Sequence, residues 1–159
     1  EPLKVLLNKH RNEIEITKGV IEAAAGNSSS GKEVIALLLD PAVNRVVVTL
    51  QLVQALAKSF DALAMKKLLM YYGDKLKITE EVAEAAAGNW NSGKEVMALL
   101  PDQRDEANIT KEVVEAAAWN CSGKEVMVLL LDQRSNEVRI TEEVVKAAAR
   151  NDTGTTLLA

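Results

Sequence analysis

Two glycine-rich segments that end in lysine have the clearest capacity for chemistry. Residues 26–32 (Gly-Asn-Ser-Ser-Ser-Gly-Lys) and 88–94 (Gly-Asn-Trp-Asn-Ser-Gly-Lys) both fit the first seven positions of a phosphate-binding P-loop. The next residue, however, is Glu33 or Glu95, where a P-loop has a serine or threonine that holds magnesium. A third copy has Trp119 in place of the first glycine, and a helical pattern precedes each segment where a P-loop follows a strand. We therefore predict turns between helices, with no cofactor.

The other reactive residues are too isolated to form a catalytic or metal centre. His10 is the one histidine and Cys121 the one cysteine, and they lie far apart in the sequence. Catalysis needs a base or nucleophile at hand, and a metal site needs clustered ligands. The neighbouring acids at 80–81 and 142–143 point about 100° apart on a helix, so they suit the helix dipole better than acid–base catalysis. The sequence predicts no catalytic residue, no metal site and no enzymatic activity.

The composition indicates a helical core of aliphatic side chains. Hydrophobic residues make up 48% of the 159 residues but aromatic residues only 3%. A net charge of −4 argues against nucleic acid or an anionic membrane as the main partner, and no apolar run approaches the roughly 18 residues of a membrane span. The single cysteine favours a reducing, cytoplasmic location. Four glycosylation sequons leave secretion as the alternative, at Asn27, Asn108, Asn120 and Asn151.

A tandem repeat of about 31 residues runs through the chain, and a threonine opens each copy. The copies begin at Thr17, Thr49, Thr79, Thr110 and Thr141, and all but the second run from Ile-Thr to Ala-Ala-Ala. A fixed period of this kind is typical of stacked units that share one core. We predict a single solenoid domain over 1–159, with repeats at 17–48, 49–78, 79–109 and 110–140 and partial repeats at 1–16 and 141–159.

Each repeat is predicted to hold two short antiparallel helices, which makes the fold an all-α solenoid. The first helix starts at the threonine as N-cap and ends at the alanines, where Gly26 and Gly88 suit a left-handed C′ position. The second starts at a serine with a glutamate three residues on, which has the form of a capping box. These pairs are Ser30/Glu33, Ser92/Glu95 and Ser122/Glu125. Short extended stretches such as 75–78 and 137–140 link one pair to the next.

The best-preserved copies set the predicted bounds of the helices. First helices are expected at 79–87, 110–118 and 141–149, and second helices at 30–39, 92–100 and 122–131. In the drifted second copy the two helices are expected near 50–57 and 61–70. Residues 5–8 match 129–132, so the chain is expected to begin and end within second helices, as a fragment of a larger protein.

The second helix resembles that of an ankyrin repeat, which runs Gly-x-x-Glu-Val-Val-x-Leu-Leu-Leu. Residues 125–131 (Glu-Val-Met-Val-Leu-Leu-Leu) and 33–39 (Glu-Val-Ile-Ala-Leu-Leu-Leu) follow this pattern. The first helix departs from it, since Glu-Glu-Val at 80–82 replaces Pro-Leu-His, and the period is about two residues short of 33. The wording Ile-Thr-Glu-Glu-Val-Val-Lys-Ala-Ala-Ala also resembles repeats in C-terminal regions of fungal NACHT-type receptor proteins. These resemblances imply a scaffold for protein–protein interaction.

Partner-binding residues can be carried over from ankyrin-like stacks, which use loop tips and the outer side of the first helix. In the loops these are Gln103, Arg104, Asp105, Glu106, Gln133, Arg134, Ser135 and Asn136. On the first helices they are Glu80, Glu84, Lys111, Glu115, Glu142 and Lys146.

Two further features leave alternatives open. Trp90 and Trp119 either form a competing binding surface or cover the ends of the aliphatic core. The alternative function is an enzyme whose Gly-Lys-Glu turns handle a phosphorylated or anionic small ligand through Lys32, Lys94 and Lys124.

Overall fold

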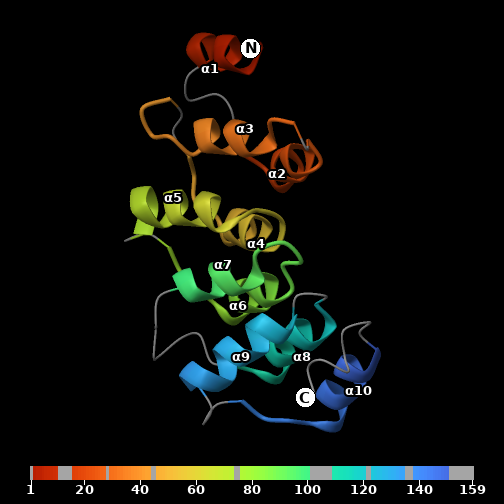
Figure 1. Cartoon of the computed structure of the whole chain (residues 1–159). Helices are drawn as coiled ribbons and strands as arrows, with labels where there is room; N and C mark the ends of the chain where they lie inside the picture. Colours follow the sequence, from red (N-terminus) through yellow and green to blue (C-terminus); the bar gives the residue numbers. More distant parts are fainter. Residues whose placement is uncertain are drawn as a thin grey trace.

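The computed structural model of the chain describes residues 2–10, 16–27, 29–43, 46–73, 76–100, 109–120, 123–134 and 138–150. Within these ranges all regular structure is helical and no strand occurs. The helices follow one another along the array from α1 to α10 (Figure 1). The predicted all-α fold is confirmed, and the described parts of the extended links, 76–79 and 138–140, contain no strand.

Helix α1 (Pro2–Lys9) begins the array, and the helices after it form consecutive pairs. The pairs are α2 (Lys18–Ala25) with α3 (Gly31–Leu38), α4 (Leu50–Ser59) with α5 (Ala62–Tyr72), α6 (Glu80–Ala87) with α7 (Gly93–Leu99), and α8 (Lys111–Trp119) with α9 (Gly123–Arg134), followed by α10 (Glu142–Arg150). The longest described helix has 12 residues. One bound was wrong: α9 continues through Arg134, three residues beyond its predicted end.

The helices stack in two layers. Each first helix contacts the next first helix, so α2, α4, α6, α8 and α10 form one layer. The second helices α3, α5, α7 and α9 contact one another in the same order and form the other layer. Figure 1 shows this progression from the red helix α1 to the blue helix α10. Contacts therefore run within a pair or between neighbouring pairs, which is the arrangement of a solenoid.

Threonine caps define where the first helices begin. The hydroxyl oxygens of Thr17, Thr49, Thr110 and Thr141 each accept a hydrogen bond from the backbone N–H three residues on, at 3.2–3.5 Å. Such a bond satisfies one of the amide groups left open at a helix start. Thr79 is the exception and makes no side-chain cap.

Two predicted features of the turns, the left-handed glycines and the capping boxes, are wrong. Gly26 and Gly88 have φ of −71° and −80°, so neither adopts the left-handed conformation. Ser30 and Ser92 make no side-chain cap, so the capping boxes do not form there, and Ser122 lies outside the described residues. An asparagine replaces the serine: the Oδ1 atoms of Asn27 and Asn89 accept the backbone N–H of Ser30 and Ser92, at 3.1 and 3.0 Å.

The glycine that begins a second helix is needed because two backbones approach closely. A Cβ atom on Gly31 would lie 1.9 Å from the carbonyl oxygen of Ala24, and one on Gly123 would lie 2.0 Å from that of Ala117. Real Cβ contacts are never this short, so a larger residue must push the two helices apart. Glycine thus lets the second helix start directly against the end of the first.

The core is aliphatic, as the composition predicted. On α6 the residues three and seven positions after Thr79, Val82 and Ala86, belong to the buried cluster around α4. The residues at positions four and eight, Ala83 and Ala87, belong to the cluster around α8. A first helix in the interior therefore buries two small faces, one against the preceding repeat and one against the following repeat.

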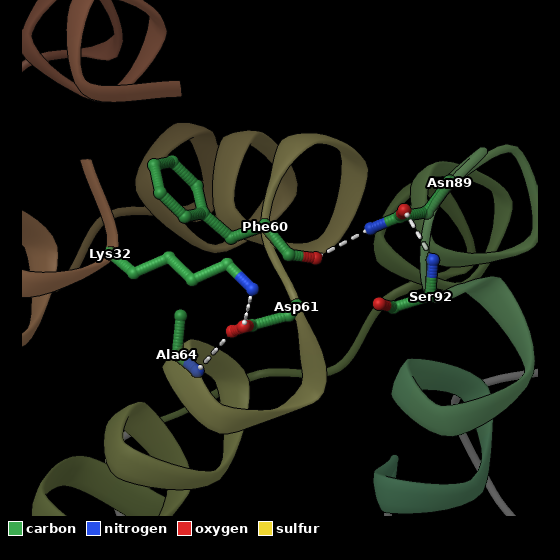
Figure 2. A network of polar contacts seen from close by, with 6 residues as sticks. All are labelled: Lys32, Phe60, Asp61, Ala64, Asn89 and Ser92. Carbon is green, nitrogen blue, oxygen red and sulfur yellow. Dashed lines mark hydrogen bonds and ion pairs between the residues drawn. The ribbon is translucent and has the colours of Figure 1, made fainter. Parts of the chain in front are cut away.

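Buried asparagines join consecutive repeats. Asn89 is 1% exposed, and its Nδ2 donates to the carbonyl oxygens of Ala57 and Phe60, both at 2.7 Å. Figure 2 shows the bond to Phe60 beside the turn bond to Ser92. Asn120 is fully buried, and its Nδ2 donates to the carbonyls of Ala87 and Asn89, both at 2.8 Å. Buried carbonyl groups that find a donor in the next repeat tie the two repeats together.

The junction before the drifted copy is built differently. The asparagine position holds Ser59, and Lys32 reaches across from α3 so that its Nζ lies 2.7 Å from Oδ2 of Asp61 (Figure 2). Asp61 also caps α5, because its Oδ1 accepts the N–H of Ala64 at 3.2 Å. The Oη of Tyr72 donates to the carbonyl of Leu39 at 3.3 Å. An ion pair and a tyrosine thus occupy the junction where the later ones have an asparagine.

Candidate functional site

A groove of about 680 Å³ runs across the layer of first helices. It extends over α2, α4, α6 and α8 and reaches the turns that follow α6 and α8. The residues lining it are Lys18, Gln51, Gln54, Ala55, Lys58, Glu81, Glu84, Ala85, Gly88, Trp90, Ala116, Trp119 and Asn120. Four repeats therefore contribute to one continuous surface.

Small residues form the apolar part of this groove. Ala55, Ala85 and Ala116 each lie six residues after the threonine of their repeat, so the repeat places them on equivalent faces of α4, α6 and α8. A Cβ atom on Gly88 would meet the Cβ of Ala116 at 3.9 Å, which shows how closely the end of α6 approaches α8. Because these side chains are short, the groove is open to a segment of another molecule.

The two tryptophans are the large apolar side chains of the groove. Trp90 lies in the turn after α6 and is 68% exposed, and Trp119 ends α8 and is 52% exposed. Neither belongs to the buried clusters, so a large part of each side chain lies outside the core. Exposed tryptophans in a concave surface are typical of positions that contribute strongly to binding.

The polar residues of the groove differ from one helix to the next. Gln51, Gln54 and Lys58 come from α4, whereas Glu81 and Glu84 come from α6. Lys18 at the α2 end lies 3.4 Å from Glu22 on the same helix. The repeat thus keeps the small residues of the groove constant and varies the polar and charged residues around them.

Of the predicted partner-binding residues, Trp90, Trp119 and Glu84 line this groove. Gln133 and Arg134 lie in the last turn of α9, so their placement in a loop was wrong, because the helix continues beyond its last apolar residue. The remaining loop residues lie outside the described ranges: Gln103, Arg104, Asp105, Glu106, Ser135 and Asn136.

Several of the predicted first-helix residues form ion pairs along the array. Lys111 lies 3.3 Å from Glu115 on its own helix and 3.8 Å from Glu143 on α10. Lys146 lies 2.6 Å from Glu142. Since most of these side chains are exposed, each pair contributes little to stability. Glu80 is half-buried at the start of α6 and does not line the groove.

The Gly-Lys-Glu residues begin the second helices α3 and α7, and the residues just before them form the turns. The backbone N–H groups of Ser29 and Ser30 donate to Oδ1 of Asn27, which closes the turn on itself. Lys32 forms an ion pair with Asp61, with 2.7 Å between Nζ and Oδ2. The preceding elements are the helices α2 and α6, where a P-loop would have strands. The pattern of small and polar residues is therefore explained by turn formation, as predicted.

Within the described ranges no group of three His, Cys, Asp or Glu side chains is arranged to hold a metal ion. Across the same ranges, no helix is both long and apolar enough to cross a membrane. His10 follows α1, and Cys121 lies outside the described ranges. Full burial of Asn120 leaves no space for a glycan at that sequon in the folded chain.

The inter-repeat bonds of Asn89 and Asn120 were not predicted from the sequence, where Asn120 stood out only as a glycosylation sequon. Asn27, Asn89 and Asn120 each lie ten residues after the threonine of their repeat. This regular spacing was the available signal. A polar residue that recurs at one position of a repeat, next to buried alanines, indicates a hydrogen bond between repeats.

A family model described as a domain of unknown function, DUF7104, matches four segments of the chain: 5–34, 68–97, 99–127 and 129–156. Together they cover most of the sequence, in consecutive units of about 30 residues. The unmatched stretch between the first two segments contains most of the drifted copy. No curated protein and no solved structure matches the chain.

Proposed function

The chain belongs to the DUF7104 family, and we propose that its repeats form a non-catalytic scaffold that binds another protein. The observation that carries this proposal is the groove across the first helices, with both tryptophans of the chain exposed along it. A polar rim around small and aromatic residues suits recognition of a protein segment.

The finer identity of the scaffold follows the resemblances in its sequence. We infer an ankyrin-like mode of action, in which the repeat core is constant and the outer side of the first helices selects the partner. By the same reasoning the repeats belong to a fungal receptor of the NACHT type. A cytoplasmic location is part of this proposal, since a chain with one cysteine has no internal disulfide that would need an oxidising compartment.

The competing enzymatic function has less support. It requires the lysines of the Gly-Lys-Glu turns to meet an anionic ligand, yet Lys32 already lies 2.7 Å from the Asp61 carboxylate. The turns also recur with the repeat, whereas catalysis needs a single constellation of groups. Nucleotide hydrolysis that disappears in Lys94→Ala would favour the enzyme over the scaffold.

The scaffold proposal is tested by identifying a partner and removing the groove's aromatic side chains. The purified chain is used to capture proteins from an extract, and direct binding of each candidate is then measured with purified components by calorimetry. We expect Trp90→Ala/Trp119→Ala to weaken the genuine interaction at least about 30-fold, since an interface hot spot contributes 2 kcal/mol or more.

A matched control removes exposed apolar side chains of similar exposure outside the groove. Leu63 and Met70 on α5 are 57% and 65% exposed and do not line it. Leu63→Ala/Met70→Ala should bind the partner like the wild type. Equal affinity for the tryptophan variant, with its fold intact by circular dichroism, would contradict the placement of the site. The charge-reversal pair Arg104→Glu/Arg134→Glu then tests the surface around Arg104 and the end of α9 instead.

A further inference from the structure

The charges that line the groove across the first helices are unevenly distributed along the stack. Both lysines of the groove, Lys18 and Lys58, come from α2 and α4, and both carboxylates, Glu81 and Glu84, come from α6. The two tryptophans lie in the turn after α6 and at the end of α8. Among the described residues, the part of the groove formed by α6, α8 and their turns therefore has both carboxylates and both tryptophans, and no lysine.

Comparison of the repeats shows that α6 differs from the other first helices in its charged residues. At the positions one and five residues after the opening threonine, α2, α8 and α10 each have a lysine paired with a glutamate. These pairs are Lys18–Glu22 at 3.4 Å, Lys111–Glu115 at 3.3 Å and Glu142–Lys146 at 2.6 Å. Helix α4 has the neutral residues Leu50 and Gln54 there. Helix α6 is the exception, because both positions hold an acid, Glu80 and Glu84.

The acids of α6 are not neutralised by the described part of the chain. Among those residues, no lysine or arginine forms an ion pair with Glu80, Glu81 or Glu84. Like charges four residues apart destabilise a helix, so this arrangement of Glu80 and Glu84 does not serve the stability of α6. Glu81 and Glu84 are exposed and line the groove. Their charges are therefore available to a cationic group of a partner.

We propose that the partner of this groove is a protein segment that carries an arginine next to apolar residues. The inference rests on the scaffold function proposed above and specifies the chemistry of its partner. Arginine suits both kinds of residue in this part of the groove. Its guanidinium forms paired hydrogen bonds with a carboxylate, and its flat face stacks on tryptophan, whose ring attracts the positive charge. Glu81 and Glu84 pair with the guanidinium, while Trp90 and Trp119 contact its face and the neighbouring apolar residues.

An acidic segment fits the groove less well. It would have to pair with Lys58, which is exposed on α4 and lies apart from the helices that provide the tryptophans. Lys18 already has Glu22 within 3.4 Å. Aromatic residues are the strongest anchors of an interface, and here they share their part of the groove with carboxylates. The net charge of −4 also attracts a basic segment and repels an acidic one.

Selection from a library of short random peptides tests the proposal without a known partner. The purified wild-type chain is the target, the library contains no tryptophan, and the selected peptides are synthesised and titrated by calorimetry. Both tryptophans of the chain line the groove, so a change in tryptophan emission on titration reports binding there. We expect the selected peptides to be rich in arginine beside apolar residues and poor in acids, and Trp90→Ala/Trp119→Ala to lose their binding.

The charge reversal Glu84→Lys separates binding from folding. It places a lysine four residues after Glu80, as in the Glu142–Lys146 pair of α10, so thermal denaturation should show a chain at least as stable as the wild type. The same variant should weaken the arginine peptides at least about tenfold, since a charged hydrogen bond is replaced by repulsion. Glu95→Lys on α7 changes the net charge equally at an exposed position outside the groove. This control should bind like the wild type.

The remaining outcomes distinguish the chemistry of the partner from the position of the site. Lys58→Glu should keep or strengthen binding of an arginine peptide, and added salt should weaken it by screening. Peptides that are lost in Trp90→Ala/Trp119→Ala but keep their affinity for Glu84→Lys overturn the arginine proposal and leave the scaffold function intact. So do peptides that are lost in Lys58→Glu, or a selection that yields no groove-binding peptide. Arginine peptides that bind the tryptophan variant like the wild type overturn the position of the site, and with it both proposals.

Discussion

The turns after α2 and α6 have nearly the same sequence and the same local geometry, yet they contribute differently to the fold. In both, the asparagine Oδ1 accepts the N–H groups two and three residues ahead, at 3.0–3.2 Å. The Nδ2 of Asn89 reaches two carbonyls of the preceding repeat, whereas that of Asn27 stays within its own turn. The motif therefore determines the turn, and the neighbouring repeat determines whether the residue also joins two repeats.

The drifted copy shows a third way in which a repeat contacts the one before it. Its junction with the preceding pair has Ser59 at the asparagine position and is held by the Lys32–Asp61 pair and by Tyr72. Amide-to-carbonyl bonds in the buried interior are shielded from solvent, whereas the Lys32 side chain is 71% exposed. A junction held by an exposed ion pair should therefore respond to salt and pH, and the asparagine junctions should not.

The largest effect is expected at the most buried asparagine. Asn120→Ala leaves the carbonyls of Ala87 and Asn89 without this donor inside the protein. Each buried group left unpaired costs about 1–3 kcal/mol, so we expect the free energy of unfolding to fall by about 2–4 kcal/mol. Urea denaturation followed by circular dichroism measures this loss. Asn91→Ala, at an exposed position, is the control and should change stability little.

The second largest effect is expected where the backbones approach most closely. Gly31→Ala places a Cβ atom 1.9 Å from the Ala24 carbonyl oxygen, and such overpacking costs about 1–3 kcal/mol. Gly73 has nothing within 4 Å of the added atom, so Gly73→Ala should be neutral or slightly stabilising. If thermal denaturation shows the two alanine variants to be equally stable, the close approach of α2 and α3 is not a constraint on this fold.

A smaller effect, dependent on salt and pH, is expected at the drifted junction. Partial burial acts to raise the pKa of Asp61, but hydrogen bonds from Lys32 and the Ala64 backbone hold that pKa below its ordinary value. The hydrogen bond and charge of Asp61 raise the pKa of Lys32 above its ordinary value. The pair's contribution is thus present between the ordinary pKa values of aspartate and lysine.

At acid pH this contribution is lost as the pH falls through the lowered pKa of Asp61, and at alkaline pH as it rises through the raised pKa of Lys32. Asp61→Asn keeps a cap for Ala64 but removes the charge. It should destabilise less than Asn120→Ala, and the difference from wild type should vanish in about 1 M salt, where charges are screened within about 3 Å. A loss of stability that is the same at low and high salt would show that the ion pair does not matter.

Much of the helical layout follows directly from the sequence. The threonines and the apolar periodicity predicted the helix pairs, since N-caps and a buried face are local properties read from neighbouring residues. The roles of the glycines were not predicted correctly. Gly26 and Gly88 were expected in a left-handed conformation that they do not adopt. Gly31 is needed because α2 and α3 approach closely, and a tertiary contact of this kind cannot be read from the glycine alone.

The candidate site was only partly predictable. Trp90 and Trp119 stood out because large aromatics are not needed to close a turn, but their exposure depends on how the repeats stack. Both tryptophans line one groove together with Glu84 of α6. Whether they do so depends on how far each helix pair is displaced relative to the next. That offset is set by the small residues between first helices and by the asparagine bonds, which no single repeat reveals.

The most direct test of the account compares the same substitution at two equivalent positions. Asn27→Ala and Asn89→Ala remove the same turn bonds, but only Asn89 donates to the preceding repeat. Urea denaturation should show Asn89→Ala to be less stable than Asn27→Ala by about 2 kcal/mol or more. Equal losses at the two positions would contradict the claim that neighbouring repeats are joined through this asparagine.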